Sequence, residues 1–294
     1  HHDALATMGG GPSSFQGHRF RGRATGRLRG AVAGVGRVGR GRLMGLITVQ
    51  DVHKAYGGVQ ALHGCTMSFD EGAVNGLIGP NGSGKTTLFN VMTGYERADS
   101  GRVLLRGADI TSANPSAIFE AGVGRTFQLT RIFPRLTVLE NVHVGARRPG
   151  VLAQMRNWTT VTEHDRATEA LDFVGLTPLA REAAGSLSYG QQKLLEFASI
   201  MVARPAVMLL DEPAGGVNPT LLRHLAGRIK ALNAEGVTFV IVEHDMEFVM
   251  GICHQVSVMH NGRALRSGPP DEVRADPAVL EAYLGTDADL AEAD

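Results

Sequence analysis

The sequence predicts an α/β fold built around a parallel β-sheet, and three observations support this prediction. Short apolar segments with strand character alternate with helix-favouring segments after residue 46, as in βαβ units. A glycine-rich loop at residues 79–87 lies between one of these strands and the helix that follows it. Residues 134–184 favour helices, which indicates an all-helical insert in the α/β core.

The elements before the insert follow from their residue types. Residues 46–52 have the apolar and β-branched composition of a strand, and Gly57-Gly58 marks a turn after them. Asp70-Glu71-Gly72 marks a second turn, which leads into the apolar strand 73–78. The remaining elements expected here are a helix at 86–93, a hairpin at 101–109 and a brief helix at 115–122.

Beyond the insert, apolar strands and helices alternate again. Gly and Pro interrupt the insert itself at 149–150 and 175–178. A hairpin at 256–265 turns on Asn261-Gly262, the dipeptide that favours a type I′ turn. The other expected elements are a helix at 189–203, a buried strand at 206–210, a helix at 219–235 and a strand at 238–242.

The composition is that of an ordinary globular protein. Of 294 residues, 43% are hydrophobic and 20% are charged, and the length allows one large domain or two small ones. The longest apolar runs, such as 207–210 and 237–242, are far shorter than the roughly 18 residues that span a bilayer. We therefore expect any membrane association to go through a partner. Cys65 and Cys253 lie too far apart in sequence for a metal-ligand spacing, and we expect two reduced thiols in a cytosolic protein.

The N-terminal tail, residues 1–43, differs from the rest of the chain. It is rich in Gly and holds eight Arg and one acid, which leaves 21 of the 29 basic and 28 of the 29 acidic side chains to residues 44–294. With almost no periodic apolar pattern, it is expected to be disordered. Three roles stay open, namely an RNA-binding arm, an anionic-lipid anchor and a transit peptide. The alternative is that translation begins at Met44 and the tail is not native. At the other end, residues 286–294 form an acidic tail.

The glycine-rich loop matches a phosphate-binding pattern. Residues 79–86 (GPNGSGKT) fit G-x-x-x-x-G-K-[ST] in full, after an apolar strand and at the start of a helix. Backbone N–H groups of such a loop surround phosphate oxygens, and the helix N-terminus adds partial positive charge. Lys85 places a full charge at the β- and γ-phosphates, and the Thr86 hydroxyl can ligate Mg²⁺. The pattern predicts ATP binding, against the alternative of a chance glycine loop. The residues expected to hold the nucleotide here are Gly79, Pro80, Asn81, Gly82, Ser83, Gly84, Lys85, Thr86 and Thr87.

A second motif is the buried strand that ends in Asp211-Glu212-Pro213. A carboxylate at the end of such a strand is where a P-loop protein holds Mg²⁺, and Asp211 would act on the metal through water. Glu212 points to a different region and is suited to polarise an attacking water as general base. The two carboxylates indicate ATP hydrolysis, and the alternative is a solvated acidic turn.

With three further motifs in the same order, the chain resembles the ABC ATPase family over residues 46–285. Residues 187–192 (LSYGQQ) are similar to the family signature Leu-Ser-Gly-Gly-Gln, with Tyr in place of its first Gly. Gln128 matches the glutamine of the family's Q-loop, and His244 matches its switch histidine. Tyr56 falls where the family stacks an aromatic ring on adenine.

This resemblance implies a P-loop NTPase fold, with a RecA-like core, an antiparallel β subdomain and an all-helical ABC subdomain at about 130–194. It also implies a shared site, because two cassettes of the family pack head to tail with each ATP between the P-loop of one and the signature of the other. By the same resemblance, the residues acting in hydrolysis are Glu212, His244, Lys85 and Gln128; those binding nucleotide besides the P-loop are Tyr56, Ser188, Gly190 and Gln191; and those holding Mg²⁺ are Thr86, Gln128 and Asp211.

Within the family, the chain is most similar to the ATPase subunits of bacterial branched-chain amino acid importers, the type with the longer helical insert. The segments that carry this likeness are 77–90 (LIGPNGSGKTTLFN), 124–128 (GRTFQ), 187–192 (LSYGQQ), 212–219 (EPAGGVNP), 241–250 (IVEHDMEFVM) and 282–285 (AYLG). It implies a second cassette, equal or different, two integral membrane permeases, an indirectly coupled solute-binding protein, and a location on the cytoplasmic face of the cell membrane. Residues 130–139, beside the Q-loop, would receive a helix of the permease, although Phe133 is equally explained as ordinary core.

Two positions depart from the family pattern. Tyr189 is bulkier than the usual Gly, and Asn218 stands where the segment after the general base, the D-loop, usually has Asp. Neither change removes a catalytic group. Two other functions stay open, an importer ATPase for urea or amides and a non-transport ABC ATPase acting on nucleic acid. The single cassette and the lack of sustained heptads argue against the second, so no nucleic-acid partner is expected.

Overall fold

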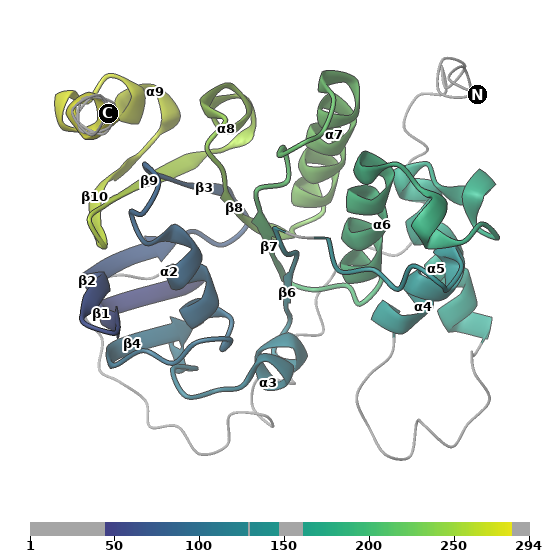
Figure 1. The fold of residues 1–294 in the computed structure, drawn as a ribbon, viewed down its shortest axis with the longest axis horizontal. Helices are drawn as coiled ribbons and strands as arrows, with labels where there is room; N and C mark the ends of the chain where they lie inside the picture. The colour runs from purple at the N-terminus through teal and green to yellow at the C-terminus, as the bar shows by residue number, and fades with distance from the viewer. Residues whose placement is uncertain (1–44, 129, 147–160, 284–294) are drawn as a thin grey trace.

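The computed structural model describes residues 45–128, 130–146 and 161–283. The predictions for the tail at 1–43, the interruption at 149–150 and the acidic tail at 286–294 therefore lie outside the described residues. Figure 1 displays three groups of elements: a central sheet, a four-stranded sheet on one side of it, and a group of helices beyond its other edge.

The central sheet brings the glycine-rich loop and the carboxylates to one edge. Its order is β10-β9-β3-β8-β7-β6, and every neighbouring pair is parallel except β10 with β9. Because the carboxyl ends of parallel strands meet at one edge, the segments that follow β3, β6, β7 and β8 lie together. The strands are β3 (Val74–Ile78), β6 (Val123–Arg125), β7 (Val207–Asp211), β8 (Thr238–Val242), β9 (Gln255–His260) and β10 (Arg263–Gly268).

Both faces of this sheet are covered, which explains why its middle strands are buried throughout. In β7, Val207 and Leu209 belong to one hydrophobic cluster, and Met208 and Leu210 belong to the other. The first cluster joins the sheet to α2 and to the four-stranded sheet, and the second joins it to α6, α7 and α8. Successive side chains of a strand point to opposite faces, so a strand covered on both faces needs an unbroken apolar run. The core helices are α2 (Lys85–Met92), α7 (Pro219–Ala234), α8 (Met246–Ile252) and α9 (Pro270–Arg274).

The four-stranded sheet is antiparallel, as predicted, with the order β2-β1-β4-β5. Its first strand continues past the expected end at residue 52 to Tyr56. Asp51 has a φ of 49° beside a break in the pairing register, and this bulge lets the strand continue through polar residues. The strands are β1 (Ile47–Tyr56), β2 (Val59–Phe69), β4 (Ser100–Leu105) and β5 (Ala108–Asp109), and helix α3 (Pro115–Glu120) follows them.

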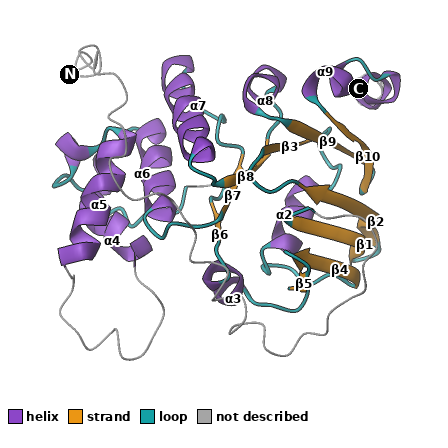
Figure 2. Cartoon of the chain, turned by 180° about the vertical axis from the view of Figure 1, so that it is seen from behind, coloured by secondary structure: helices purple, strands orange, loops and turns teal. Residues whose placement is uncertain are grey.

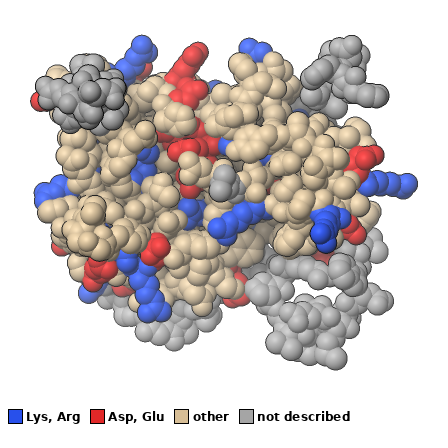
Figure 3. Space-filling view, viewed as in Figure 1, with Lys and Arg blue, Asp and Glu red and all other residues tan. Residues whose placement is uncertain are grey.

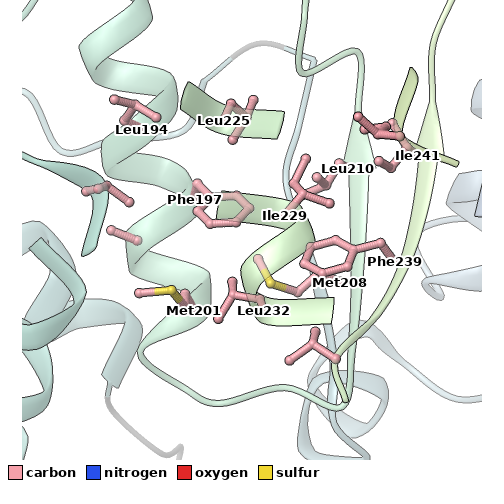
Figure 4. Close-up of a cluster of buried hydrophobic side chains, with 14 of the residues drawn as sticks. Leu194, Phe197, Met201, Met208, Leu210, Leu225, Ile229, Leu232, Phe239 and Ile241 are labelled. Carbon is pink, nitrogen blue, oxygen red and sulfur yellow. The ribbon is translucent and has the colours of Figure 1, made fainter. Parts of the chain in front are cut away.

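The third group of elements is helical, in agreement with the predicted insert (Figures 1 and 2). It contains α4 (Val138–Ala146), α5 (Val161–Val174), two short 3-10 turns (Thr177–Leu179 and Ala184–Ser186) and α6 (Tyr189–Met201). Figure 4 displays one buried cluster in which α6 packs on α7 and the central strands; it includes Leu194, Phe197 and Met201 of α6, Leu225, Ile229 and Leu232 of α7, Met208 and Leu210 of β7, and Phe239 and Ile241 of β8. One face of α6 is therefore fixed to the core.

Some elements were predicted closely and others were not. The bounds of β8 agree with the prediction, and the turn at Asn261-Gly262 has the two positive φ angles, 47° and 72°, of a type I′ turn. The elements β6, α8 and α9 were not predicted, because each is only three to seven residues long and shows little periodicity. Among the described residues, no helix is long and apolar enough to cross a membrane.

Candidate nucleotide-binding and hydrolysis site

The P-loop, residues 79–86, leads from β3 into α2 and depends on its glycines. Gly79 has a φ of 153°, and a Cβ there would overlap the carbonyl oxygen of Met259. Gly84, the N-cap of α2, has a φ of 99°, and a Cβ there would collide with the carbonyl of Ala61. Only glycine fits both positions. The tight loop leaves the first amides of α2 without a side-chain cap.

The Lys85 ammonium lies across this loop. Its Nζ donates to the carbonyl oxygens of Gly79 at 2.7 Å and Pro80 at 2.9 Å. Burial lowers the pKa of Lys85, and the carboxylates of Glu212 and Asp211 act in the opposite direction. The cation is therefore held where the P-loop and the end of β7 meet.

Asp211 ends β7 in a buried ion pair. Its Oδ2 accepts from Arg125 Nη2 at 3.0 Å, and the two side chains are only 4% and 7% exposed. Arg125 also donates to Asn90 Oδ1 at 2.8 Å and to Thr93 Oγ1 at 2.7 Å. Burial raises the pKa of Asp211, and Arg125 opposes that rise. The motifs assigned Arg125 no role, although it lies only three residues before Gln128 in the sequence.

Three of the residues expected to act in hydrolysis converge beyond Asp211. Gln128 Nε2 donates to Glu212 Oε2 at 2.9 Å, and His244 Nδ1 lies 4.0 Å from Glu212 Oε1. Glu212 has a φ of 47°, in the left-handed region that a residue with a side chain seldom adopts. The side chain of His244 is 63% exposed, so it is accessible from solvent.

Glu243 is a further buried acid that the motifs did not single out. Its side chain has no exposed surface and accepts from the backbone N–H groups of Ala214 and, at 3.1 Å, of His244. Burial raises its pKa, while these N–H donors oppose that rise. Glu243 thereby ties the segment after Glu212 to the segment that carries His244.

The signature residues lie elsewhere in the chain. Ser188 is the N-cap of α6: its Oγ accepts from the Gln191 N–H at 3.4 Å, and the Gln191 Oε1 accepts from the Ser188 N–H at 2.9 Å. A Cβ on Gly190 would overlap the side chain of Leu221. In Figures 1 and 2, α2 and α6 lie on opposite sides of β6 and β7. The structure therefore places the signature turn apart from the P-loop of the same chain.

The other predicted nucleotide-binding residues differ in exposure: Gly79, Pro80 and Ser83 are buried and Thr87 is half-buried, whereas Tyr56 and part of the P-loop are exposed. Tyr56 ends β1 with its side chain 42% exposed, and Lys54 Nζ lies 5.2 Å from the ring centroid. Asn81, Gly82 and Thr86 are exposed at the P-loop. On the face drawn in Figure 3, acidic and basic side chains meet near the centre, where Figure 1 has the central strands.

Hard oxygen atoms suit a Mg²⁺ ion bound with nucleotide. The expected set offers the exposed hydroxyl of Thr86, the carboxylate of Asp211 and the amide oxygen of Gln128. Gln128 uses its amide nitrogen on Glu212, which leaves its oxygen as an acceptor. Oxygen donors of these types are those that Mg²⁺ takes in phosphate-binding sites, so the residues fit the ion.

Two family models match separate parts of the chain. A model described as "ABC transporter" matches residues 62–215, and one described as "Branched-chain amino acid ATP-binding cassette transporter" matches residues 267–289. The chain is 36% identical over 252 residues to the probable branched-chain amino acid transport ATP-binding protein LivG of Methanocaldococcus jannaschii. It is 37% identical over 249 residues to the high-affinity branched-chain amino acid transport ATP-binding protein BraF of Pseudomonas aeruginosa. Each alignment covers 82% of this chain and 98% of the relative.

Solved structures agree with the fold. A nucleotide-free ATP-binding cassette from an ABC transporter is 35% identical and has a TM-score of 0.74, with 82% of this chain and 99% of that chain covered. The ADP conformation of an ATP-binding cassette of an ABC transporter gives the same identity and TM-score, over 83% and 100% of the two chains. The predicted P-loop NTPase fold is confirmed, and the chain belongs to the ABC transporter family as an ATP-binding cassette that hydrolyses ATP.

Proposed function

We propose that this cassette powers an importer for branched-chain amino acids or a related small polar solute. The relatives named above carry branched-chain amino acid transport in their names and match this chain over 98% of their length. The match at residues 267–289 supports the same branch, because it lies outside the catalytic motifs. Urea and amides remain within the proposed class of small polar solutes.

The contact of Gln128 with Glu212, beside His244, carries the catalytic part of the proposal. Glu212 is the general base that takes a proton from the attacking water. Gln128 holds one carboxylate oxygen at 2.9 Å and leaves the other directed toward His244 at 4.0 Å. Lys85, at the P-loop, neutralises charge on the β- and γ-phosphates. Tyr56 stacks on the adenine, and His244 contacts the γ-phosphate.

Mg²⁺ belongs to this proposal as the ion that offsets phosphate charge. Thr86, Gln128 and Asp211 would hold it, with Asp211 acting through water. Arg125 keeps Asp211 in place through the buried ion pair at 3.0 Å. The carboxylate therefore does not need the ion in order to be oriented.

A complete site requires a second cassette. Ser188, Gly190 and Gln191 lie at the N-terminus of α6, away from the P-loop of their own chain, so they serve the ATP bound by a partner cassette. A bacterial ABC transporter cassette that is 25% identical, with a TM-score of 0.68, has a dimeric structure. The partner is a second copy or a related cassette.

The proposed assembly also contains two integral permeases and, through them, a solute-binding protein. The permease contact lies at residues 130–139, where Phe133 is 54% exposed and available to a partner. This contact would hold the cassette on the cytoplasmic face of the cell membrane. No nucleic acid takes part.

Glu212→Gln tests the catalytic assignment. Loss of a general base lowers ATP turnover by about 10²- to 10⁴-fold, while ATP binding persists. The exposed Glu247 of α8 supplies a matched control, Glu247→Gln, with unchanged turnover. Unchanged turnover in Glu212→Gln would contradict the assignment.

The transport assignment is tested in cells. A strain without this chain should lose ATP-driven uptake of labelled leucine or a related solute and regain it with the wild type but not with Glu212→Gln. Membrane proteins that co-purify with the chain should be permeases. Normal uptake of all these solutes in the strain would contradict the transport proposal and leave the catalytic assignment untouched.

A further inference from the structure

One face of α6 reaches the hydrolysis site of its own chain. Tyr189, Lys193 and Glu196 are spaced four and three residues apart, so their side chains lie along one face of the helix. The adjoining face packs into the core through Leu194 and Phe197 (Figure 4). The three side chains are therefore carried on a helix that is fixed to the central sheet.

Lys193 holds the backbone of Glu212. Its ammonium donates to the carbonyl oxygen of Glu212 at 2.6 Å, and the N–H of Gly215 donates to the same oxygen at 3.2 Å. The left-handed φ of Glu212, 47°, is a conformation that a residue with a side chain keeps only where its surroundings enforce it. This conformation sets the direction of the Glu212 carboxylate, so Lys193 acts on the carboxylate through the main chain.

Glu196 holds the segment that carries Gln128. Its Oε1 accepts from the N–H of Phe127 at 3.2 Å and from the N–H of Arg131 at 3.3 Å. The residue is 6% exposed, so these donors lie in a buried environment where an unpaired partner would be costly. The two amides lie on either side of Gln128 in the sequence, and one carboxylate therefore closes the loop that presents it.

Tyr189 extends the same face to the D-loop. The ring lies so close to Gly216 that a Cβ there would sit 2.9 Å from it, and Gly216 has a φ of 69°. Lys193 Nζ lies 5.4 Å from the centroid of the same ring. The side chain that departs from the family signature thus packs on the segment that follows Glu212.

We propose that Lys193 and Glu196 are positioning residues for ATP hydrolysis. Both lie on α6, the helix that begins at the signature turn, and they hold Glu212 and Gln128 in fixed positions relative to each other and to that turn. The inference rests on the hydrolysis roles proposed above for Glu212 and Gln128. When the signature turn of α6 engages ATP on the partner cassette, the same helix would hold the base and the glutamine of its own site in their positions for hydrolysis. Each chain would in this way link the two ATP sites of the dimer.

Steady-state kinetics of the full chain, purified with its membrane partners, tests this proposal. Lys193→Met removes the donor and should lower kcat about tenfold or more while the KM for ATP changes less than about twofold. Lys193→Arg restores a donor and should recover most of kcat. Lys230→Met, on the exposed side of α7, is the matched control with wild-type kinetics. Should Lys193→Met fold poorly, Lys193→Gln keeps a polar side chain of shorter reach and should lower kcat in the same way.

Glu196 is tested in parallel. Glu196→Leu removes the acceptor for both amides and should lower kcat with little change in KM, whereas Glu196→Gln keeps an acceptor oxygen and should retain more of kcat than Glu196→Leu. In a Glu212→Gln background, Lys193→Met should add no further loss, because residues that act through one another are not additive.

Three outcomes would count against these ideas, and they can be told apart. If Glu212→Gln abolishes turnover while Lys193→Met and Glu196→Leu keep kcat within about twofold of the wild type, the positioning roles are wrong and the proposed function stands. A rise in KM at unchanged kcat would assign the two residues to binding and overturn the proposal. Normal turnover in Glu212→Gln would remove the base on which the inference rests.

Discussion

The P-loop and the signature turn each lead into the N-terminus of a helix, α2 and α6, and the two helices differ in how their first backbone amides are capped. α2 begins after Gly84, and no side chain caps its first N–H groups. α6 begins after Ser188, and Ser188 and Gln191 cap each other's backbone N–H groups in a capping box. The first amides of a helix have no partner within it. The α2 amides are therefore open to phosphate oxygens, whereas the α6 turn has already closed part of its own set.

This difference indicates how the two turns would share the work of binding ATP. The uncapped amides of α2 form hydrogen bonds only when phosphate binds, so each new bond contributes to the affinity of the P-loop for its nucleotide. A capped turn exchanges side-chain partners for phosphate oxygens, so its net gain is smaller and more easily reversed. Such a turn suits the proposed role of α6, which engages the ATP of another cassette and releases it after hydrolysis.

The largest effect should follow from Lys85→Met. The change removes the one full positive charge at the P-loop while leaving the open α2 amides in place. ATP turnover should fall about a thousandfold, since electrostatic groups at a transferring phosphoryl are worth several kcal/mol. Phosphate release measures the turnover, and a fluorescent ATP analogue measures binding. Turnover within tenfold of the wild type would mean that the amides of α2 suffice by themselves.

A second prediction concerns how α6 is fixed to the core. Burial raises the pKa of Glu196 to about 7, with the Arg131 and Phe127 amides opposing. The folded chain therefore holds this proton more tightly than the unfolded chain, and the resulting stability is full below the ordinary pKa near 4.5 and lost as pH rises to about 7. Glu196→Gln does not ionise. Its stability relative to the wild type should rise by about 3 kcal/mol across that interval, because one pKa unit is worth about 1.4 kcal/mol.

Urea unfolding at pH 4.5 and pH 7.5 measures that difference. Glu272→Gln, at an exposed position of α9, supplies a control that should show no comparable trend. The helix α2 contains no Asp or Glu, so its packing on the core should add no such pH dependence to the free energy of unfolding. A flat difference for Glu196→Gln would mean that the carboxylate is ionised at little cost, through the Lys193 and Arg131 charges beside it.

The motifs predicted those parts of the site in which chemistry requires particular residues at fixed spacing. The P-loop and the carboxylate pair could be located from sequence; in the structure Gln128 donates to Glu212, and His244 lies 4.0 Å from it. Arg125 could not be paired with Asp211 in advance, because the pair depends on β6 lying next to β7 across 86 residues of sequence. β6 itself is three residues long and has no strand pattern of its own.

The contacts made by α6 could not be foreseen for a related reason. Lys193 and Glu196 look like ordinary polar positions on an amphipathic helix, and the signature motif ends before them. Their partners are backbone atoms, namely the Glu212 carbonyl and the Phe127 and Arg131 amides. Backbone groups are the same in every residue type, so the sequence does not reveal which of them a side chain will contact. Strand order and backbone conformation, rather than composition, create these bonds.

Ser188→Ala should have a smaller effect on stability and a selective one on function. Loss of an N-cap side chain costs about 1 kcal/mol, which chemical unfolding can resolve. Asn114→Ala, which removes the N-cap of α3, provides the same chemistry away from the site. Ser188→Ala alone should lower turnover, while ATP binding by dilute single chains stays unchanged. Weaker ATP binding by those dilute chains would place Ser188 at its own P-loop and break the distinction between the two turns.

The smallest effect should come from Asn218→Asp, at a third helix N-terminus. Asn218 Oδ1 caps α7 by accepting from the Leu221 N–H at 2.9 Å, and Asp can accept the same bond. The added charge should stabilise the chain by about 0.5 kcal/mol through the helix dipole, as should Asn114→Asp at α3. Turnover should differ between these two variants by less than about twofold, because both changes keep the cap acceptor and remove no catalytic group. A severalfold rise in turnover for Asn218→Asp alone would mean that a charge after Glu212 acts on the ATP site. The N-terminus of α7 would then take part in hydrolysis, as those of α2 and α6 are proposed to do.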